Sequence, residues 1–210
     1  MAMPRCEIDH LVISAPDLAS GIEHVRQRLG AAPQPGGKHA RLGTHNCVLK
    51  LGESSYLEVI APDPDAPKPD RPRWFELDRV PAPRLATWVA RTTDIHATVT
   101  AASEPLGPVE PMSRGSLRWL ITIPADGTLP LGGTAPALIE WKTKPHPASA
   151  LLESGCSLLR LEAFHPDATR VSALLESIGV EGAISVSPLS PGSRPYVVGH
   201  ILTAHGTRTI

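Results

Sequence analysis

Three segments of the chain share one pattern of hydrophobic and polar positions. Residues 6–30 read CEIDHLVISAPDLASGIEHVRQRLG, an apolar strand followed by Asp17 as helix N-cap, an amphipathic helix, and Gly30 as its stop. Residues 84–103 repeat the pattern with Thr93 or Asp94 as the cap. Residues 157–180 repeat it again, and this weak repeat predicts three strand-helix units.

Extended segments follow the first two predicted helices. Residues 40–51 and 55–60 alternate well enough to form antiparallel strands, with a short strand expected near residues 31–39. Residues 116–123 and 137–143 repeat this arrangement after the second helix. The first two units are therefore predicted to be βαβββ modules.

The predicted domain boundaries follow from the repeat. We expect a first βαβββ module over residues 1–60, a second βαβββ-like module over 85–145, and a shorter C-terminal βαββ module over 146–210. Residues 61–84 are too rich in proline for a regular element and should connect the modules. The aromatic pair Trp74-Phe75 in this connection either packs onto the core or lines a pocket.

Composition narrows the functional class. The chain has 210 residues, a formal net charge of −1 and no block of like charge, so we expect no nucleic-acid partner and no charged membrane surface. It lacks a long apolar segment, which predicts a cytoplasmic protein that does not enter a membrane. A small molecule or a second copy of the chain is the expected partner.

The chain has three widely spaced cysteines, a number and spacing that suit reduced thiols: Cys6, Cys47 and Cys156.

One histidine stands in the first predicted strand, within the run IDHLVI. His10 should share a face with Ile8 and Val12, while Leu11 and Ile13 point the other way. An enclosed imidazole needs a polar partner. It is either a core histidine bonded to a backbone carbonyl or a ligand in a site.

Two lone carboxylates raise the same question. Glu58 lies in SYLEVI and Glu140 in ALIEWKT, each in the last strand of its unit, where an unpaired charge is costly. Together with His10 they could converge as ligands of a divalent ion, for which Zn, Fe, Mn, Ni and Co all suit nitrogen and carboxylate oxygen. The alternative is that they bond to arginine or solvent.

The segment GGKHARLGTHN is a second candidate site. His39, His45 and Asn46 enter a strand from a glycine-flanked loop, where they could bind an oxyanion or act as acid and base. A plain turn with solvated side chains explains the same residues. Arg114, Arg118 and Lys142 are expected to be solvated charges on strand faces.

Several of these stretches together resemble the vicinal oxygen chelate superfamily, in its glyoxalase-like domain group. The resemblance rests on IDHLVISAPDLASGIEHV, GGKHARLGTHNCVLKLGESSYLEVIAPDP and PRWFELD. It implies an α+β fold in which paired βαβββ modules form a curved open barrel. It also implies a divalent metal held by His10, Glu58 and Glu140. The repeat sets Thr87, a poor metal ligand, at the fourth position.

The leading functional hypothesis is a metal-dependent enzyme of the glyoxalase-like group acting on a small oxygen-chelating substrate, by isomerase, lyase or dioxygenase chemistry. His45 is the first candidate for proton transfer, with His39, Asn46 and Trp74 as substrate contacts. The alternative is a metal-free protein that binds an aromatic or antibiotic-like ligand in the same barrel. Because modules of that superfamily work in pairs, a homodimer is expected.

Overall fold

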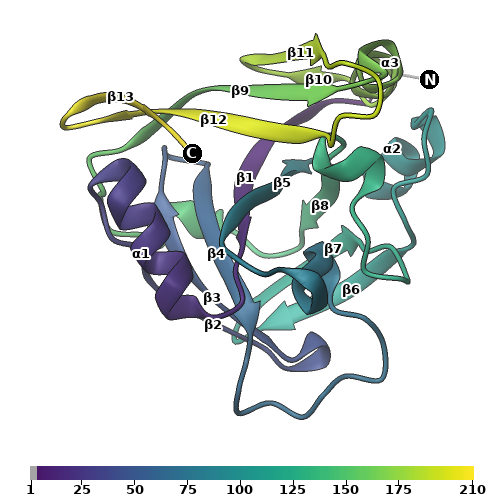
Figure 1. Ribbon diagram of the computed structural model, residues 1–210. Helices are drawn as coiled ribbons and strands as arrows, with labels where there is room; N and C mark the ends of the chain where they lie inside the picture. Colours follow the sequence, from purple (N-terminus) through teal and green to yellow (C-terminus); the bar gives the residue numbers. More distant parts are fainter. Residues whose placement is uncertain (1–3) are drawn as a thin grey trace.

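Two β-sheets and three α-helices build residues 4–210 in the computed structural model, which describes this part of the chain (Figure 1). The larger sheet holds the first two units, and the smaller sheet lies across it. The strands and helices, in chain order, are β1 Cys6–Ser14, α1 Leu18–Leu29, β2 Gln34–His39, β3 Thr44–Lys50, β4 Tyr56–Pro62, β5 Arg84–Arg91, α2 Ile95–Ala101, β6 Val109–Arg114, β7 Leu117–Thr122, β8 Ala137–Trp141, β9 Ser157–His165, α3 Ala168–Ser177, β10 Val180–Glu181, β11 Ile184–Pro188, β12 Tyr196–Thr203 and β13 Gly206–Thr209.

The larger sheet is built from two copies of one pairing scheme. Its strands run in the order β2-β3-β4-β1-β5-β8-β7-β6, with β10 pairing beside β1. In each copy the first strand pairs in parallel with the last, and the two remaining strands follow in antiparallel order. The copies meet at the antiparallel pair β1 and β5. This arrangement confirms the predicted repeat of βαβββ units.

The larger sheet curls until its edge strands approach each other. Arg41, just after β2, donates from Nη1 to the carbonyl oxygen of Pro111 on β6 at 3.1 Å. The carboxylate of Glu110 binds both Arg41 and Arg71 across the same seam. The result is a mixed α+β fold with a nearly closed, barrel-like sheet, which confirms the predicted fold class.

Aspartate caps begin all three α-helices of residues 4–210. The Asp17 side chain accepts from the Ser20 amide at 2.8 Å, and Gly30 ends α1 with a φ of 71°. Asp94, and not Thr93, caps α2 through the Ala97 amide. Asp167 caps α3.

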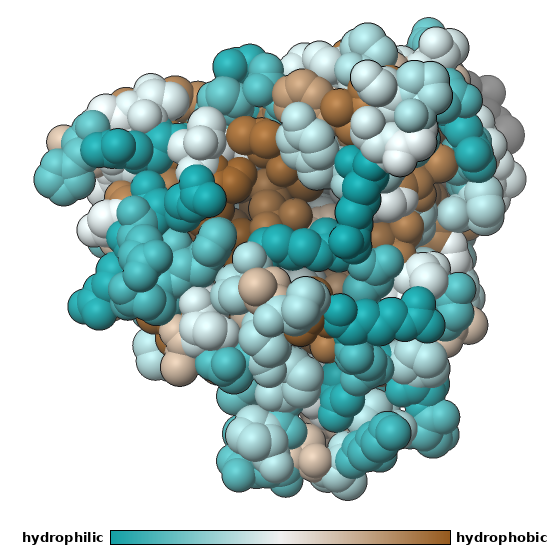
Figure 2. All heavy atoms as spheres, in the orientation of Figure 1, coloured by the Kyte–Doolittle hydropathy of each residue, from teal (hydrophilic) through white to brown (hydrophobic). Residues whose placement is uncertain are grey.

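The strand β1 separates two apolar cores. Leu11 and Ile13 pack outward, against α1 and the smaller sheet β11-β9-β12-β13, which contributes residues such as Leu161 and Ile201. Val12 points inward, into the barrel. On the face shown in Figure 2, apolar side chains gather in the seam beneath the smaller sheet, and polar side chains cover most of the remainder. The smaller sheet therefore covers the barrel from outside, and the apolar core inside the barrel consists of residues between Val12 and Ile139.

The structure differs from the sequence-based expectation at two places. Residues 40–43 were expected to be strand, but Ala40–Leu42 form a short 3-10 turn that ends at Gly43 with a φ of 57°. The strand β6 was not predicted, because its sequence VEPMSR carries a proline and little apolar alternation. None of the helices in residues 4–210 has the length and apolar character needed to cross a membrane.

Candidate functional site inside the barrel

A β-bulge in β1 places two polar side chains together inside the protein. The pairing of β1 with β5 shifts register between Ile8 and His10, and such a bulge re-aims the side chains beside it. Asp9 and His10 are both buried, and His10 Nδ1 lies 2.6 Å from Asp9 Oδ1. Ile8 instead packs against the outer core, so the expectation that it shares the His10 face is wrong.

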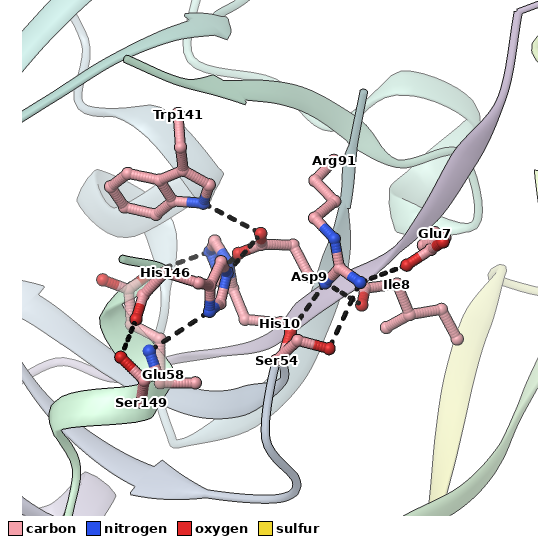
Figure 3. Close-up of polar contacts among 11 residues, drawn as sticks. Glu7, Ile8, Asp9, His10, Ser54, Glu58, Arg91, Trp141, His146 and Ser149 are labelled. Carbon is pink, nitrogen blue, oxygen red and sulfur yellow. Dashed lines mark hydrogen bonds and ion pairs between the residues drawn. The ribbon is translucent and has the colours of Figure 1, made fainter. Parts of the chain in front are cut away.

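The Asp9 carboxylate is fully buried and accepts from three side chains (Figure 3). Besides His10, the donors are Trp141 Nε1 and His146 Nε2, each 2.9 Å from Oδ2. The Ala148 amide donates to the other ring nitrogen of His146, which assigns the hydrogen to Nε2. Burial opposes the ionised form, but hydrogen bonds and charge from His10 and His146 outweigh it and hold the pKa of Asp9 well below its ordinary value.

Glu58, on β4, faces the other nitrogen of His10. Its Oε2 lies 3.6 Å from His10 Nε2, and both side chains are buried. The Asn46 amide donates to Glu58 Oε1, while Asn46 Oδ1 accepts from the Gly37 amide and from Arg114 Nη1, each at 2.8 Å. One continuous series of polar contacts therefore runs from Arg114 to Asp9.

Tyr56 covers the His10 ring. The two rings stack with their centroids 4.5 Å apart. Burial raises the pKa of Tyr56 well above its ordinary value, and the negative charges of Asp9 and Glu58 add to that effect. Tyr56 therefore stays protonated and fixes the plane of the imidazole.

These polar groups face a cavity with aromatic walls. The cavity is small: it leaves about 20 Å³ for the centre of a water-sized molecule, and part of it is open to solvent. His39 and Trp74 on its wall are both anchored to the Thr44 hydroxyl, at 3.1 Å and 3.3 Å. Burial is the main reason that the pKa of His39 falls to about 4, so this ring is neutral at pH 7. The lining consists of His10, His39, Asn46, Tyr56, Glu58, Trp74, Phe75, Arg114, Trp119, Ile121, Ile139 and Trp141.

The structure brings most of the predicted site residues together, but not all of them. His10, Glu58, His39, Asn46 and Trp74 all line the cavity.

Two further predicted site residues lie elsewhere. His45 stands between Thr44 and Asn46 on β3, and the alternation of the strand turns its side chain to the opposite face from Asn46. Glu140 is turned outward in the same way, because its neighbours Ile139 and Trp141 point into the cavity. Glu140 instead accepts from the Ile95 amide at 3.1 Å and pairs with Lys142.

The second unit therefore does not supply the ligands that the resemblance implied. Val89 lies opposite His10 on β5, and Thr87 donates its hydroxyl to the Ala135 carbonyl at 3.2 Å. Across residues 4–210, no group of three or more His, Cys, Asp or Glu side chains is arranged to hold a metal ion. The donors that are present do not fit a divalent ion held by ligands from both units.

Three residues of the site could not be identified from the sequence pattern. Asp9 was visible only as a second polar residue beside His10 in an apolar strand. Arg114 was expected to be a solvated charge on a strand face, but it ends β6 with its side chain partly buried on the cavity wall. His146 lies in the loop KPHPAS, where nothing in the pattern distinguishes it from a surface histidine.

Comparisons with known proteins agree with this fold. The sequence model of the glyoxalase-like domain family matches residues 8–179. A search of curated protein sequences finds no significant match to this chain.

Among solved structures, a hypothetical protein from Staphylococcus aureus has 12% sequence identity and a TM-score of 0.57, over 97% of this chain and 84% of that one. Methylmalonyl-CoA epimerase from Mycobacterium tuberculosis has 20% identity and a TM-score of 0.42, over 68% of this chain and 91% of that one. A mutant 4-hydroxymandelate synthase from Streptomyces coelicolor has 17% identity and a TM-score of 0.48, over 99% of this chain and 62% of that one. At these identities the S. aureus structure shows a shared fold and nothing about activity.

The family match spans most of the chain, and the chain therefore belongs to the glyoxalase-like domain family, within the vicinal oxygen chelate superfamily.

Proposed function

We propose that this protein is a glyoxalase-like enzyme that moves a proton at the carbon beside a carbonyl group of a small substrate, with His10 and Glu58 as the proton-transfer pair. The observation that supports this most directly is the pair itself. His10 Nε2 and Glu58 Oε2 face each other at 3.6 Å on the wall of the cavity, and Asp9 fixes the opposite side of the His10 ring.

The positions of the hydrogen atoms on the His10 ring explain why His10 and Glu58 suit proton transfer. The Nδ1 hydrogen of His10 points at Asp9, so an unprotonated Nε2 would turn its lone pair toward the Glu58 carboxylate. Two electron-rich atoms at that distance repel each other unless a proton lies between them. A proton carried by either group would lie between these two atoms, next to the space where a substrate would lie.

The proposed step uses each residue of the pair once. The Glu58 carboxylate takes a proton from the carbon beside the carbonyl, and the electron pair of that C–H bond moves onto the carbonyl oxygen. His10 gives its Nε2 proton to that oxygen, which completes an enol. In the reverse half, Glu58 gives a proton to carbon while the enol O–H proton returns to His10 Nε2, which restores the carbonyl group and both residues and gives the isomerised or exchanged product. Asp9 fixes the orientation of the His10 ring through Nδ1, in the way that a buried aspartate orients a catalytic histidine.

The rest of the cavity supports the same chemistry. The Asn46 amide holds Glu58 in place through its hydrogen bond to Oε1. Indole and phenyl rings from Trp74, Phe75 and Trp119 limit the water around the pair, which strengthens each electrostatic contact inside.

Two other functions remain as alternatives. A metal-dependent enzyme would retain His10 and Glu58 as ligands, but it would need further donors that neither Glu140 nor β5 supplies. A metal-free protein that only binds a small aromatic ligand is favoured by the aromatic walls of the cavity.

Solvent exchange tests the proposal. A panel of small aldehydes and ketones is incubated with the protein in D2O, and incorporation of deuterium beside the carbonyl is followed by NMR. We expect His10→Gln and Glu58→Gln to slow exchange by about 10²-fold or more, as expected for removal of a general acid or base. His45→Gln, which alters a histidine outside the cavity, should exchange deuterium at the same rate as the wild type.

Three results would separate the alternatives. Exchange that is absent from the whole panel, or equal in all three variants, overturns the proposal. Activity that is lost with a chelator and restored by a divalent ion identifies the metal-dependent enzyme. A ligand that raises the melting temperature without exchange identifies the binding protein.

A further inference from the structure

We infer that the ligand of this cavity is a small organic carboxylate, and that Arg114 binds its carboxylate group. The inference rests on the proposed function in one respect, because it takes the His10–Glu58 cavity to be the substrate site. It goes beyond that proposal by naming the charge and the shape of the substrate.

Arg114 is distinguished from the other arginines by its lack of a carboxylate partner. Within residues 4–210, the ion pairs of the structure leave five arginines without a partner, and four of these are exposed: Arg28, Arg79, Arg118 and Arg208. Arg114 is the fifth, and it is partly buried on the cavity wall. A partly buried cation without a counter-charge is costly, unless a ligand supplies one.

The protein holds the Arg114 guanidinium in place with a neutral group. Nη1 donates to Asn46 Oδ1 at 2.8 Å, and this oxygen also accepts from the Gly37 amide. A guanidinium has five N–H donors, and this contact uses one of them. No other hydrogen bond of Arg114 occurs within residues 4–210, so the remaining donors are available to a ligand.

Two consecutive glycines make room for this arrangement. A Cβ atom on Gly36 would lie 2.1 Å from Asn46 Oδ1, and one on Gly37 would lie 2.6 Å from Arg114 Cδ. Neither glycine has a positive φ, so their role here is space and not backbone conformation. The GGKH segment is thus explained by the side chains of Asn46 and Arg114.

The polarity of the cavity selects the kind of ligand. Arg114 lies at one end of the polar series and the His10–Glu58 pair at the other, with Asn46 between them. A planar guanidinium matches a carboxylate with two parallel hydrogen bonds. A phosphate would bring a second negative charge toward Glu58. The aromatic walls suit an apolar body, so the geometry points to a carboxylate on a compact apolar or aromatic skeleton.

Binding of two matched probes tests this inference. Phenylacetate and phenylacetamide share one shape, and only the first carries a charge. Titration is followed by the fluorescence of the tryptophans that line the cavity, with no turnover required. We expect wild-type protein to bind phenylacetate at least tenfold more tightly than phenylacetamide. In Arg114→Gln this preference should disappear, and in Arg114→Lys it should weaken. Arg118→Gln, an exposed arginine on the neighbouring strand, should behave as wild type.

The outcomes are distinct from those of the exchange experiment. His10→Gln should retain the preference for phenylacetate even where it abolishes exchange, so failed chemistry and failed recognition can be told apart. Retained phenylacetamide binding and an unchanged melting temperature show that Arg114→Gln is folded. The inference is overturned if wild type shows no preference, if neither probe binds at millimolar concentration, or if the preference survives Arg114→Gln.

Discussion

The Nδ1 atom of His10 lies 2.6 Å from Oδ1 of Asp9, although the two residues are neighbours on one strand. Side chains of adjacent strand residues ordinarily point to opposite faces. The bulge in β1 removes that separation and places both polar groups inside the protein. The carboxylate can therefore orient the imidazole without help from a distant segment.

Asp9→Asn should lower the free energy of unfolding by roughly 3 kcal/mol at pH 7, because it breaks a buried, charged network with two histidines and a tryptophan. The pKa of Asp9 is held below its ordinary value of 3.8, so its stabilising contribution is complete above that pH and is lost as the pH falls further. The difference in the free energy of unfolding between wild type and Asp9→Asn, measured by urea unfolding, should become smaller below pH 4.

The control is Asp70→Asn, which alters an exposed aspartate in the proline-rich connection. It should leave the stability unchanged at both pH values. An equal loss of stability in Asp9→Asn at pH 7 and at pH 3 would show that Asp9 acts through packing and not through its charge.

His39→Asn should make the protein less sensitive to mild acid. Burial lowers the pKa of His39 from 6.5 to about 4, so the unfolded chain takes up a proton that the folded protein refuses. The free energy of unfolding therefore does not depend on His39 protonation above pH 6.5. Below that pH it decreases toward pH 4, and protonation of this residue accounts for as much as about 3 kcal/mol of the decrease. Melting temperatures from pH 7 to pH 4 should fall less steeply in the variant. His205→Asn, at an exposed position, should retain the wild-type slope, and equal slopes for all three proteins would contradict the prediction.

Glu140→Gln should affect the start of α2 and leave the cavity unchanged. The Glu140 carboxylate accepts from the Ile95 amide at the first residue of α2 and pairs with Lys142. Glutamine keeps an oxygen that can accept from the amide but removes the negative charge at the start of the helix, which costs about 0.5 kcal/mol. Phenylacetate affinity and divalent metal content, measured by elemental analysis, should equal those of wild type. Stoichiometric metal that disappears in Glu140→Gln would instead place this residue in a metal site.

Gly37→Ala should weaken carboxylate binding, although Gly37 is not itself proposed to contact the ligand. The new methyl group would meet Arg114 Cδ at 2.6 Å and displace the guanidinium, so we expect about a tenfold loss of phenylacetate affinity, near 1.4 kcal/mol. Phenylacetamide affinity should stay the same. Gly52→Ala, a comparable change in the loop between β3 and β4, should alter neither value.

Much of the fold could be predicted because its signals are local. Asp17 and Gly30 bound the first helix by capping, and apolar alternation marks most strands. The repeat then predicted the antiparallel pairs β3–β4 and β7–β8, one in each unit. The prediction failed at β6, where a proline and polar residues pair well with β7 although they lack a strand pattern. Association of two copies and the role of the C-terminal segment as a module stay predictions.

The site could be predicted only in part. His10 and Glu58 were visible because a polar residue in an apolar strand needs a partner, and they do face each other. Glu140 followed the same reasoning, but the direction of a side chain depends on the register of one short strand, which sequence does not determine. Arg114 reaches the cavity through the curl of the whole sheet, which brings β6 beside β2. No local pattern contains that information.

The central position of β1 and β5 also determines when the cavity can form during synthesis of the chain. His10, Asn46 and Glu58 leave the ribosome early, but Arg114, Trp141 and His146 follow only after the proline-rich connection and most of the second unit. β1 has no β5 to pair with until residues 84–91 follow, and the carboxylate of Asp9 lacks two of its three donors until Trp141 and His146 follow. A growing chain therefore carries an open sheet edge until β5 follows and an uncompensated carboxylate until the loop of His146 follows, and this interval is where a chaperone would be of most use to this protein.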